Sequence, residues 1–192
     1  MYIGHPLAVE IKRESNFQYE PVKGNIALLP GSRKHEVDRI LPEMAELARL
    51  MPQFHFTIAA VPHLPPALYD RWLSGLPNVD RVVGDMKKVL GASEAAIVTS
   101  GTATLETGLL GVPQIVVYKG SPLSYQIARR LIKVKFISLV NLIMGRLVVP
   151  ELIQAECAPA KMAEQLSQIL EPSSSLAMRD AYLKLSDLLT SG

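Results

Sequence analysis

The stretch Glu94–Glu106, EAAIVTSGTATLE, joins an apolar run to a helical pattern through a turn of small residues. Ala95–Val98 is typical of a buried strand, and the helical pattern begins directly after Gly101. The first N–H groups of a helix have no acceptor within the helix, and the helix dipole makes that end electropositive. Because Ser100–Thr104 are small, these donors would stay open, which indicates a site for phosphate or another anion. An ordinary connection capped by a Ser or Thr side chain is an equally supported interpretation.

A second cluster, Gly31, Ser32 and Arg33, follows the expected strand Asn25–Leu29. Gly31 permits a tight turn, and Ser32 can cap the helix that follows. Arg33 brings a planar guanidinium group, which suits phosphate or carboxylate. Glu36 lies in the first helical turn, where a carboxylate also simply complements the helix dipole. The chain contains neither the dinucleotide pattern G-x-G-x-x-G nor a P-loop.

A third cluster consists of Asn141, Glu151 and Gln154. Glu151 and Gln154 are three residues apart, so we expect them to share one side of a short turn in otherwise apolar surroundings. Glu and Gln are natural partners for a sugar or ribose hydroxyl. Capping groups, or core groups with satisfied hydrogen bonds, are the alternative that the residues alone favour.

Composition excludes several classes of protein. The chain has 192 residues and a net charge of +2, which argues against bulk electrostatic binding of nucleic acid. Its single cysteine, Cys157, excludes an internal disulfide and points to a reducing compartment. We find no Cys or His cluster at ligand spacing and no D-x-D motif, so we expect neither a metal nor a cofactor. No apolar run is long enough to span a membrane, so we expect a soluble protein or one that touches a membrane only at its surface.

A basic amphipathic segment contains Arg129, Arg130, Lys133 and Lys135. Two interpretations are open. Such a segment is usually the solvated face of a helix, but it could also rest on anionic lipid head groups.

Short apolar runs alternate with longer helical patterns around these clusters. The expected strands are Asn25–Leu29, Phe54–Ala60, Val79–Val83, Ala95–Val98, Gln114–Tyr118 and Phe136–Leu139. The expected helices are Lys34–Met51, Pro65–Ser74, Asp85–Leu90, Thr102–Leu110, Ser124–Lys133, Pro159–Leu170 and Ser174–Leu189. This alternation predicts an α/β fold, a Rossmann-like doubly wound parallel sheet with C-terminal helices, whose ligands lie beyond the carboxyl ends of the strands. We divide the chain into a linker or hinge (1–24), a Rossmann-like ligand-binding domain (25–158) and C-terminal helices that pack on the domain or reach across it (159–192).

The three clusters, taken in order, resemble those of lipid-A-disaccharide synthase. The matching segments are Leu29–Arg33 with Glu36, Ser100–Glu106, and Asn141 with Val149–Gln154. The opening Tyr2–Leu7 resembles the hinge that leads into the C-terminal half of that enzyme. The resemblance is collinear and extends to about Leu189.

Members of this family are inverting glycosyltransferases of the two-domain GT-B type. They transfer 2,3-diacylglucosamine from its UDP donor to 2,3-diacylglucosamine 1-phosphate in lipid A biosynthesis. The resemblance implies that this chain is the half that binds UDP-2,3-diacylglucosamine, and that the lipid acceptor site and the general base belong to the N-terminal half. We therefore expect the isolated chain to be inactive, and the complete enzyme to lie on the cytoplasmic face of the inner membrane; a homodimer is left open.

The residues and the resemblance together give one set of expected substrate-binding residues. These are Gly31, Ser32, Arg33, Glu36, Ser100, Gly101, Thr102, Ala103, Thr104, Glu106, Asn141, Glu151 and Gln154. Arg33 would also stabilise the charge that develops on the departing diphosphate. The alternatives are another GT-B protein, such as a UDP-N-acetylglucosamine 2-epimerase or a peptidoglycan glycosyltransferase, and a UDP-binding module without catalysis.

Overall fold

The computed structural model describes residues 17–120 and 135–190. The expected helix Ser124–Lys133, with its basic residues Arg129, Arg130 and Lys133, lies outside these ranges, as does the hinge-like opening Tyr2–Leu7. Within the described ranges, no helix combines the length and the apolar character needed to cross a membrane.

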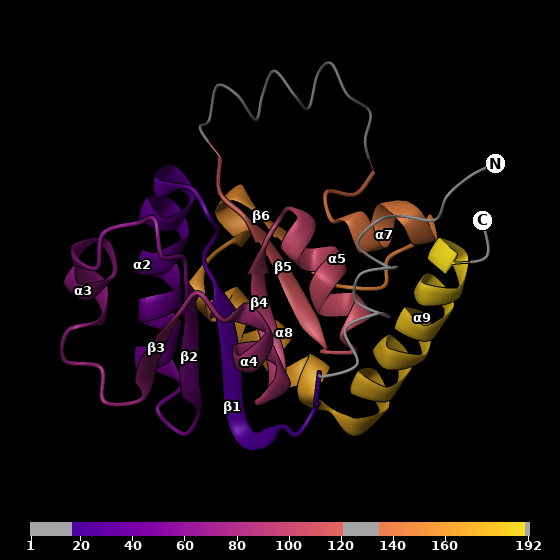
Figure 1. Ribbon diagram of the computed structural model, residues 1–192, viewed down its shortest axis with the longest axis horizontal. Helices are drawn as coiled ribbons and strands as arrows, with labels where there is room; N and C mark the ends of the chain where they lie inside the picture. Colours follow the sequence, from indigo (N-terminus) through magenta and orange to yellow (C-terminus); the bar gives the residue numbers. More distant parts are fainter. Residues whose placement is uncertain (1–16, 121–134, 191–192) are drawn as a thin grey trace.

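Six parallel strands form one sheet in the order β3-β2-β1-β4-β5-β6 (Figure 1). The strands are β1 (Val22–Leu29), β2 (His55–Ala60), β3 (Val79–Val83), β4 (Ser93–Thr99), β5 (Gln114–Tyr118) and β6 (Glu151–Ile153). The order reverses between β1 and β4, as it does in doubly wound Rossmann-like domains. The expected fold class is confirmed.

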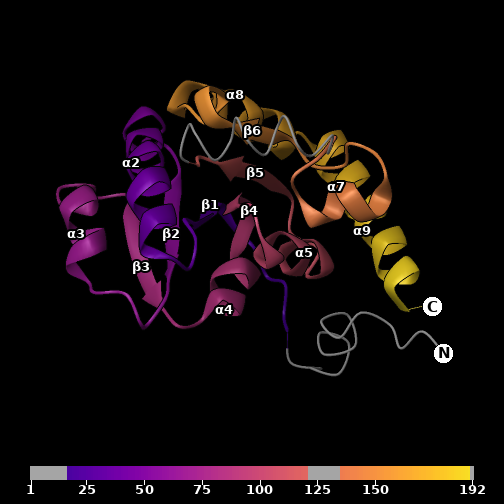
Figure 2. The same ribbon diagram turned by 90° about the horizontal axis from the view of Figure 1, so that it is seen from above.

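Helices cover both faces of this sheet (Figure 2). The helices are α2 (Lys34–Leu50), α3 (Ala67–Leu73), α4 (Met86–Gly91), α5 (Thr102–Leu109), α7 (Leu139–Met144), α8 (Pro159–Leu170) and α9 (Pro172–Thr190). Helices α2, α3 and α8 lie on one side of the sheet, and α4 and α5 lie on the other (Figure 2). The last helix, α9, packs against α5, α7 and α8. The division of the chain at residues 24 and 158 stays a prediction.

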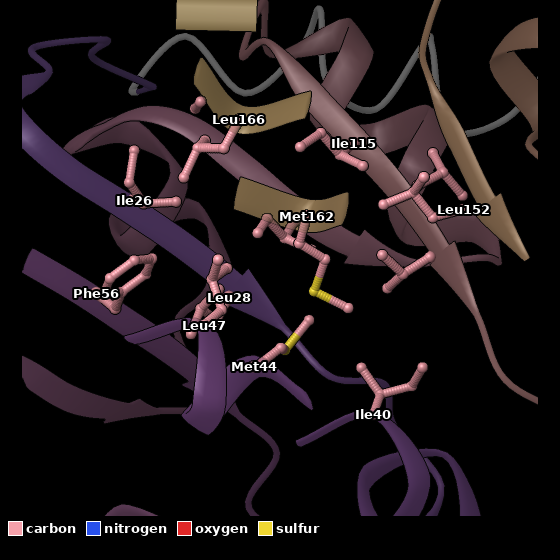
Figure 3. Packing of buried hydrophobic residues seen from close by; sticks show 14 of the residues in the cluster. Ile26, Leu28, Ile40, Met44, Leu47, Phe56, Ile115, Leu152, Met162 and Leu166 are labelled. Carbon is pink, nitrogen blue, oxygen red and sulfur yellow. The ribbon is translucent and has the colours of Figure 1, made fainter. Parts of the chain in front are cut away.

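The strands are buried on both faces, which explains their nearly continuous apolar sequences. In β1, Ile26 and Leu28 belong to the core beneath α2 and α8, whereas Ala27 and Leu29 belong to a second core beneath α4. Figure 3 shows Ile26 and Leu28 near the α2 and α8 side chains that fill the first core, among them Met44, Leu47, Met162 and Leu166. Alternating residues of each strand thus pack against helices on opposite faces of the sheet. Because the strands are parallel, their carboxyl ends lie along one edge.

The expected sixth strand, Phe136–Leu139, is wrong. Residues 135–138 form an irregular connection, and α7 begins at Leu139. Ser138 caps this helix, since its side chain accepts a hydrogen bond from Asn141 N. The apolar residues here are the start of a helix, and the sixth strand is instead the three-residue β6, which pairs with β5.

Candidate functional site

A cleft of about 570 Å³ opens at the carboxyl ends of the central strands. Its lining comprises Leu29, Gly31, Ser32, Arg33, Glu36, Ala59, Ala60, Val61, Pro62, Gly84, Met86, Thr99, Ser100, Gly101, Thr102, Ala103 and Glu106. The first two sequence clusters therefore meet in one cleft. This cleft lies at the edge of the sheet formed by the carboxyl ends of the strands, where open α/β sheets bind their ligands.

Among the residues that the structure describes, no side chain caps the start of α5. Gly101 is the N-cap residue, with φ +155 and no side-chain cap hydrogen bond. The hydroxyl of Ser100 instead donates to Ile137 O, at 3.0 Å, and that of Thr104 donates back to Gly101 O, at 2.8 Å. The interpretation as an ordinary Ser or Thr cap is therefore wrong. The first amides of α5 lack a side-chain acceptor at a helix end that attracts anions.

Glu36 organises the turn that carries Arg33. Its Oε2 accepts hydrogen bonds from Ser32 N at 3.0 Å and Arg33 N at 3.2 Å, and its Oε1 pairs with the Arg33 guanidinium at 3.2 Å. The expected Ser32 cap is wrong, because Arg33 occupies the N-cap position of α2. Since the Arg33 side chain is 73% exposed, it can turn toward a ligand in the cleft while Glu36 holds the backbone.

His63 supports the same turn from β2's side of the cleft. Its Nε2 donates to Ser32 O at 2.8 Å. These two residues are 31 positions apart, and no sequence pattern links them. A ring held in this way is a positioning group for the turn.

Gly31 cannot carry a side chain in this turn. Its φ is +111, and an added Cβ would lie 2.5 Å from Glu36 Oε2 and 2.7 Å from Glu36 Cβ. We expect Gly31→Ala to displace Glu36, to lower the free energy of unfolding by about 1–3 kcal/mol and to weaken binding in the cleft. Urea unfolding and ligand titration measure both effects.

Gly75→Ala is the matched control. Gly75 has φ +81, but no atom lies within 4 Å of its added Cβ and it does not line the cleft. Equal losses in the two variants would show that backbone strain, and not the contact with Glu36, is responsible.

The third cluster lies outside the cleft. Asn141 is fully buried: its carbonyl accepts from Val148 N and Val149 N, and its amide donates to Val149 O and Glu151 Oε1. Glu151 also accepts from Ile137 N and Ser138 N, each at 2.9 Å. These two residues join β6 to the start of α7, which is the structural interpretation that the sequence favoured.

Gln154 differs from the other two members of this cluster. It has φ +56, which is the only positive φ found outside glycine in the described ranges. Its Oε1 accepts a hydrogen bond from Gly120 N at 3.1 Å, just beyond the end of β5. Unusual backbone at such a position is often found at binding sites.

Sequence reasoning missed one wall of the cleft, formed by Ala59–Pro62, Gly84 and Met86. These residues lie at or just beyond the carboxyl ends of β2 and β3, and their types carry no chemical signal. Their place at strand ends was the one available clue, because parallel strands end at the same edge of a sheet.

The described residues include no group of three or more His, Cys, Asp or Glu side chains placed to hold a metal ion. Cys157 is buried, and burial raises the pKa of its thiol to about 11. A thiol with that pKa is protonated near neutral pH and is a poor nucleophile. The groups in the cleft that can bind an anion are the backbone amides at the start of α5 and the Arg33 guanidinium.

Known proteins are similar to this chain in sequence or in fold. A family profile described as lipid-A-disaccharide synthetase matches residues 1–189. A lipid-A-disaccharide synthase of Anaeromyxobacter dehalogenans is 39% identical over 181 residues, which cover 88% of this chain and 47% of that protein. The chain thus spans about half the length of the curated relatives it matches.

Solved structures resemble the fold at low sequence identity. A spinosyn rhamnosyltransferase complexed with thymidine diphosphate gives a TM-score of 0.56 at 19% identity, over 87% of this chain and 41% of that one. An Anabaena protein in complex with UDP and glucose gives 0.54 at 12% identity, over 96% and 48%.

Proposed function

The chain belongs to the lipid-A-disaccharide synthase family, and on that premise we propose that it is the donor-binding half of an inverting glycosyltransferase. The complete enzyme would transfer 2,3-diacylglucosamine from its UDP donor to 2,3-diacylglucosamine 1-phosphate. The observation that carries this proposal is the uncapped start of α5 in a cleft that Arg33 also lines.

In this proposal the diphosphate of UDP binds at Ser100–Thr104. Amides at the start of α5 and the helix dipole meet there, and the small side chains leave the approach open. Structural relatives with the same fold bind thymidine diphosphate or UDP, which supports a nucleoside diphosphate as the ligand. The nucleoside would extend along the wall formed by Ala59–Pro62 and Met86.

Departure of UDP leaves negative charge on its diphosphate, so donors fixed there lower the barrier to transfer. The α5 amides and Arg33 would supply this stabilisation. Gln154 lies outside the cleft, beside Gly120 at the end of β5, and would contact a hydroxyl of a part of the donor that extends beyond the cleft. Asn141 and Glu151 would act indirectly, by holding β6 and α7 in place.

Titration with UDP, UMP and uridine tests the binding proposal. If the diphosphate supplies most of the affinity, UDP binds more tightly than UMP, and uridine binds weakest. Equal affinities for the three would contradict the placement at α5.

Arg33→Ala should weaken UDP binding by about 1.5–3 kcal/mol, because charge-assisted hydrogen bonds to phosphate are lost. Arg33→Lys should recover only part of that loss, since an ammonium cannot reproduce the planar guanidinium fork. Arg49→Ala serves as the control: Arg49 is half-exposed at the other end of α2 and pairs with Glu46. Unaltered UDP affinity in Arg33→Ala would remove Arg33 from the site.

In this proposal the rest of the enzyme binds the lipid acceptor and contacts the membrane. Both implied substrates carry acyl chains, so the active site must approach the cytoplasmic face of the membrane. A UDP-binding module without catalysis remains the second candidate, because this chain covers only about half of its relatives. Glycosyl transfer measured with the complementary half separates the two.

A further inference from the structure

The short helix α7 lacks the polar outer face of an ordinary surface helix. Its sequence, Leu139–Met144, contains no charged residue. Val140 and Asn141 are fully buried, whereas Leu142 and Ile143, on the opposite side of the helix, are 43% and 36% exposed. Surface helices usually turn charged or polar side chains toward water. The outer face of α7 is therefore apolar where a polar face is expected.

The turn after α7 continues this apolar face. Gly145 ends the helix with φ +63, and Leu147 follows it, 63% exposed. Val148 N donates to Asn141 Oδ1 at 2.7 Å, so the turn folds back against the helix. Three of the nine exposed large apolar side chains in the described ranges thus fall within residues 142–147. We call Leu142, Ile143, Arg146 and Leu147 the α7 surface.

The charged residues of this segment are basic. Arg146 is exposed, and within residues 17–120 and 135–190 it forms no ion pair and no side-chain hydrogen bond. Lys135, also exposed, lies three residues before the N-cap of α7. Residues 135–150 contain no Asp or Glu. Basic side chains beside exposed apolar ones complement the head groups and acyl chains of an anionic lipid surface.

We propose that the α7 surface rests on an anionic membrane. A stable protein–protein interface takes about 20–30 residues on each side. A helix of six residues and the turn after it do not supply that many. Contact with the boundary between head groups and acyl chains needs only a few apolar side chains flanked by basic groups. A lipid surface is therefore the occupant that fits the size and charge of the α7 surface.

This membrane contact would lie beside the cleft. Ser100 lines the cleft and donates to Ile137 O at 3.0 Å, and α7 begins two residues after Ile137. The helix lies at the periphery of the molecule, next to α9 (Figures 1 and 2). The proposed function gives the membrane contact to the other half of the enzyme, so the α7 surface would be a second contact, on this half. It does not require UDP to be the ligand of the cleft.

Co-sedimentation with vesicles tests this proposal. The chain is mixed with vesicles of phosphatidylcholine alone, or of phosphatidylcholine and phosphatidylglycerol in equal parts. We expect it to bind the anionic vesicles. Leu142→Ser combined with Ile143→Ser should weaken that binding about tenfold or more, because two apolar side chains no longer enter the lipid boundary.

The matched control is Leu176→Ser combined with Leu183→Ser. These residues of α9 are 62% and 67% exposed, so the same apolar groups are removed from another helix, and vesicle binding should not change. Arg146→Gln should weaken binding at an ionic strength of about 0.1 M. Its effect should shrink at about 1 M, since the Debye length falls from about 10 Å to about 3 Å.

The outcomes separate this proposal from the proposed function. Undiminished binding in the α7 double variant, equal losses in the α7 and α9 variants, or no binding of the unaltered chain to anionic vesicles would each overturn the membrane contact. If the α7 variant kept vesicle binding but no longer associated with the complementary half, the surface would be a protein contact instead. Vesicle binding that depends on α7 in a chain that fails to bind UDP would support the α7 surface and reject the nucleotide assignment.

Discussion

Gly101→Val is expected to abolish measurable UDP binding while leaving the protein folded. Gly101 begins α5 and lines the cleft, and no protein atom lies within 4 Å of a Cβ built on it. A valine side chain would therefore stand in the open space through which we propose the diphosphate reaches the α5 amides. We expect a loss of about 100-fold or more, since the ligand loses both the amides and the helix dipole. Calorimetric titration with UDP measures it.

Backbone strain at Gly101 must be separated from steric exclusion, because its φ of +155 is rare for other residues. Gly111→Val provides the comparison: Gly111 has φ +76, an added Cβ there also meets nothing within 4 Å, and it lies after α5, away from the cleft. Gly101→Ala, with a smaller side chain, should show an intermediate loss. If Gly101→Val binds UDP as tightly as the unaltered protein, the diphosphate does not bind at this turn.

The sheet, and the edge of it at which the cleft lies, could be predicted because both are determined by local sequence. Strands β1, β4 and β5 are buried on both faces, so each stands out as an apolar run between polar turns. The turn residues around Arg33 and Gly101 follow two of these strands directly, and parallel strands bring such turns to one edge. Both clusters therefore met in the cleft, as expected.

The errors concern features set by contacts distant in sequence. β6 is only three residues long and begins with Glu151, whose carboxylate is satisfied by amides 13 and 14 residues earlier in the chain. No local pattern distinguishes such a strand from a turn, whereas Phe136–Leu139 has the composition of a strand and is not one. The role of Glu36 was likewise hidden, because the sequence could not show that its carboxylate closes the turn before it.

The 192-residue chain alone should bind UDP and form no disaccharide. In a GT-B enzyme the reaction takes place between two domains, and we propose that the acceptor site and the general base belong to the domain that corresponds to the other half of the relatives. Adding that half from a relative such as the Anaeromyxobacter enzyme should restore transfer from UDP-2,3-diacylglucosamine, measured as release of UDP and formation of the disaccharide. The same mixture prepared with Gly101→Val should remain inactive, which shows that the donor site of this chain is the one in use.

Disaccharide formed by this chain alone would contradict that division of labour and would require a base within it. Glu106 would then be tested first, because it lines the cleft and Glu151 does not. Glu106→Gln separates the two roles that a carboxylate could have there. Loss of transfer with unchanged UDP affinity would identify a base, whereas a parallel loss of both would identify a contact to the nucleotide.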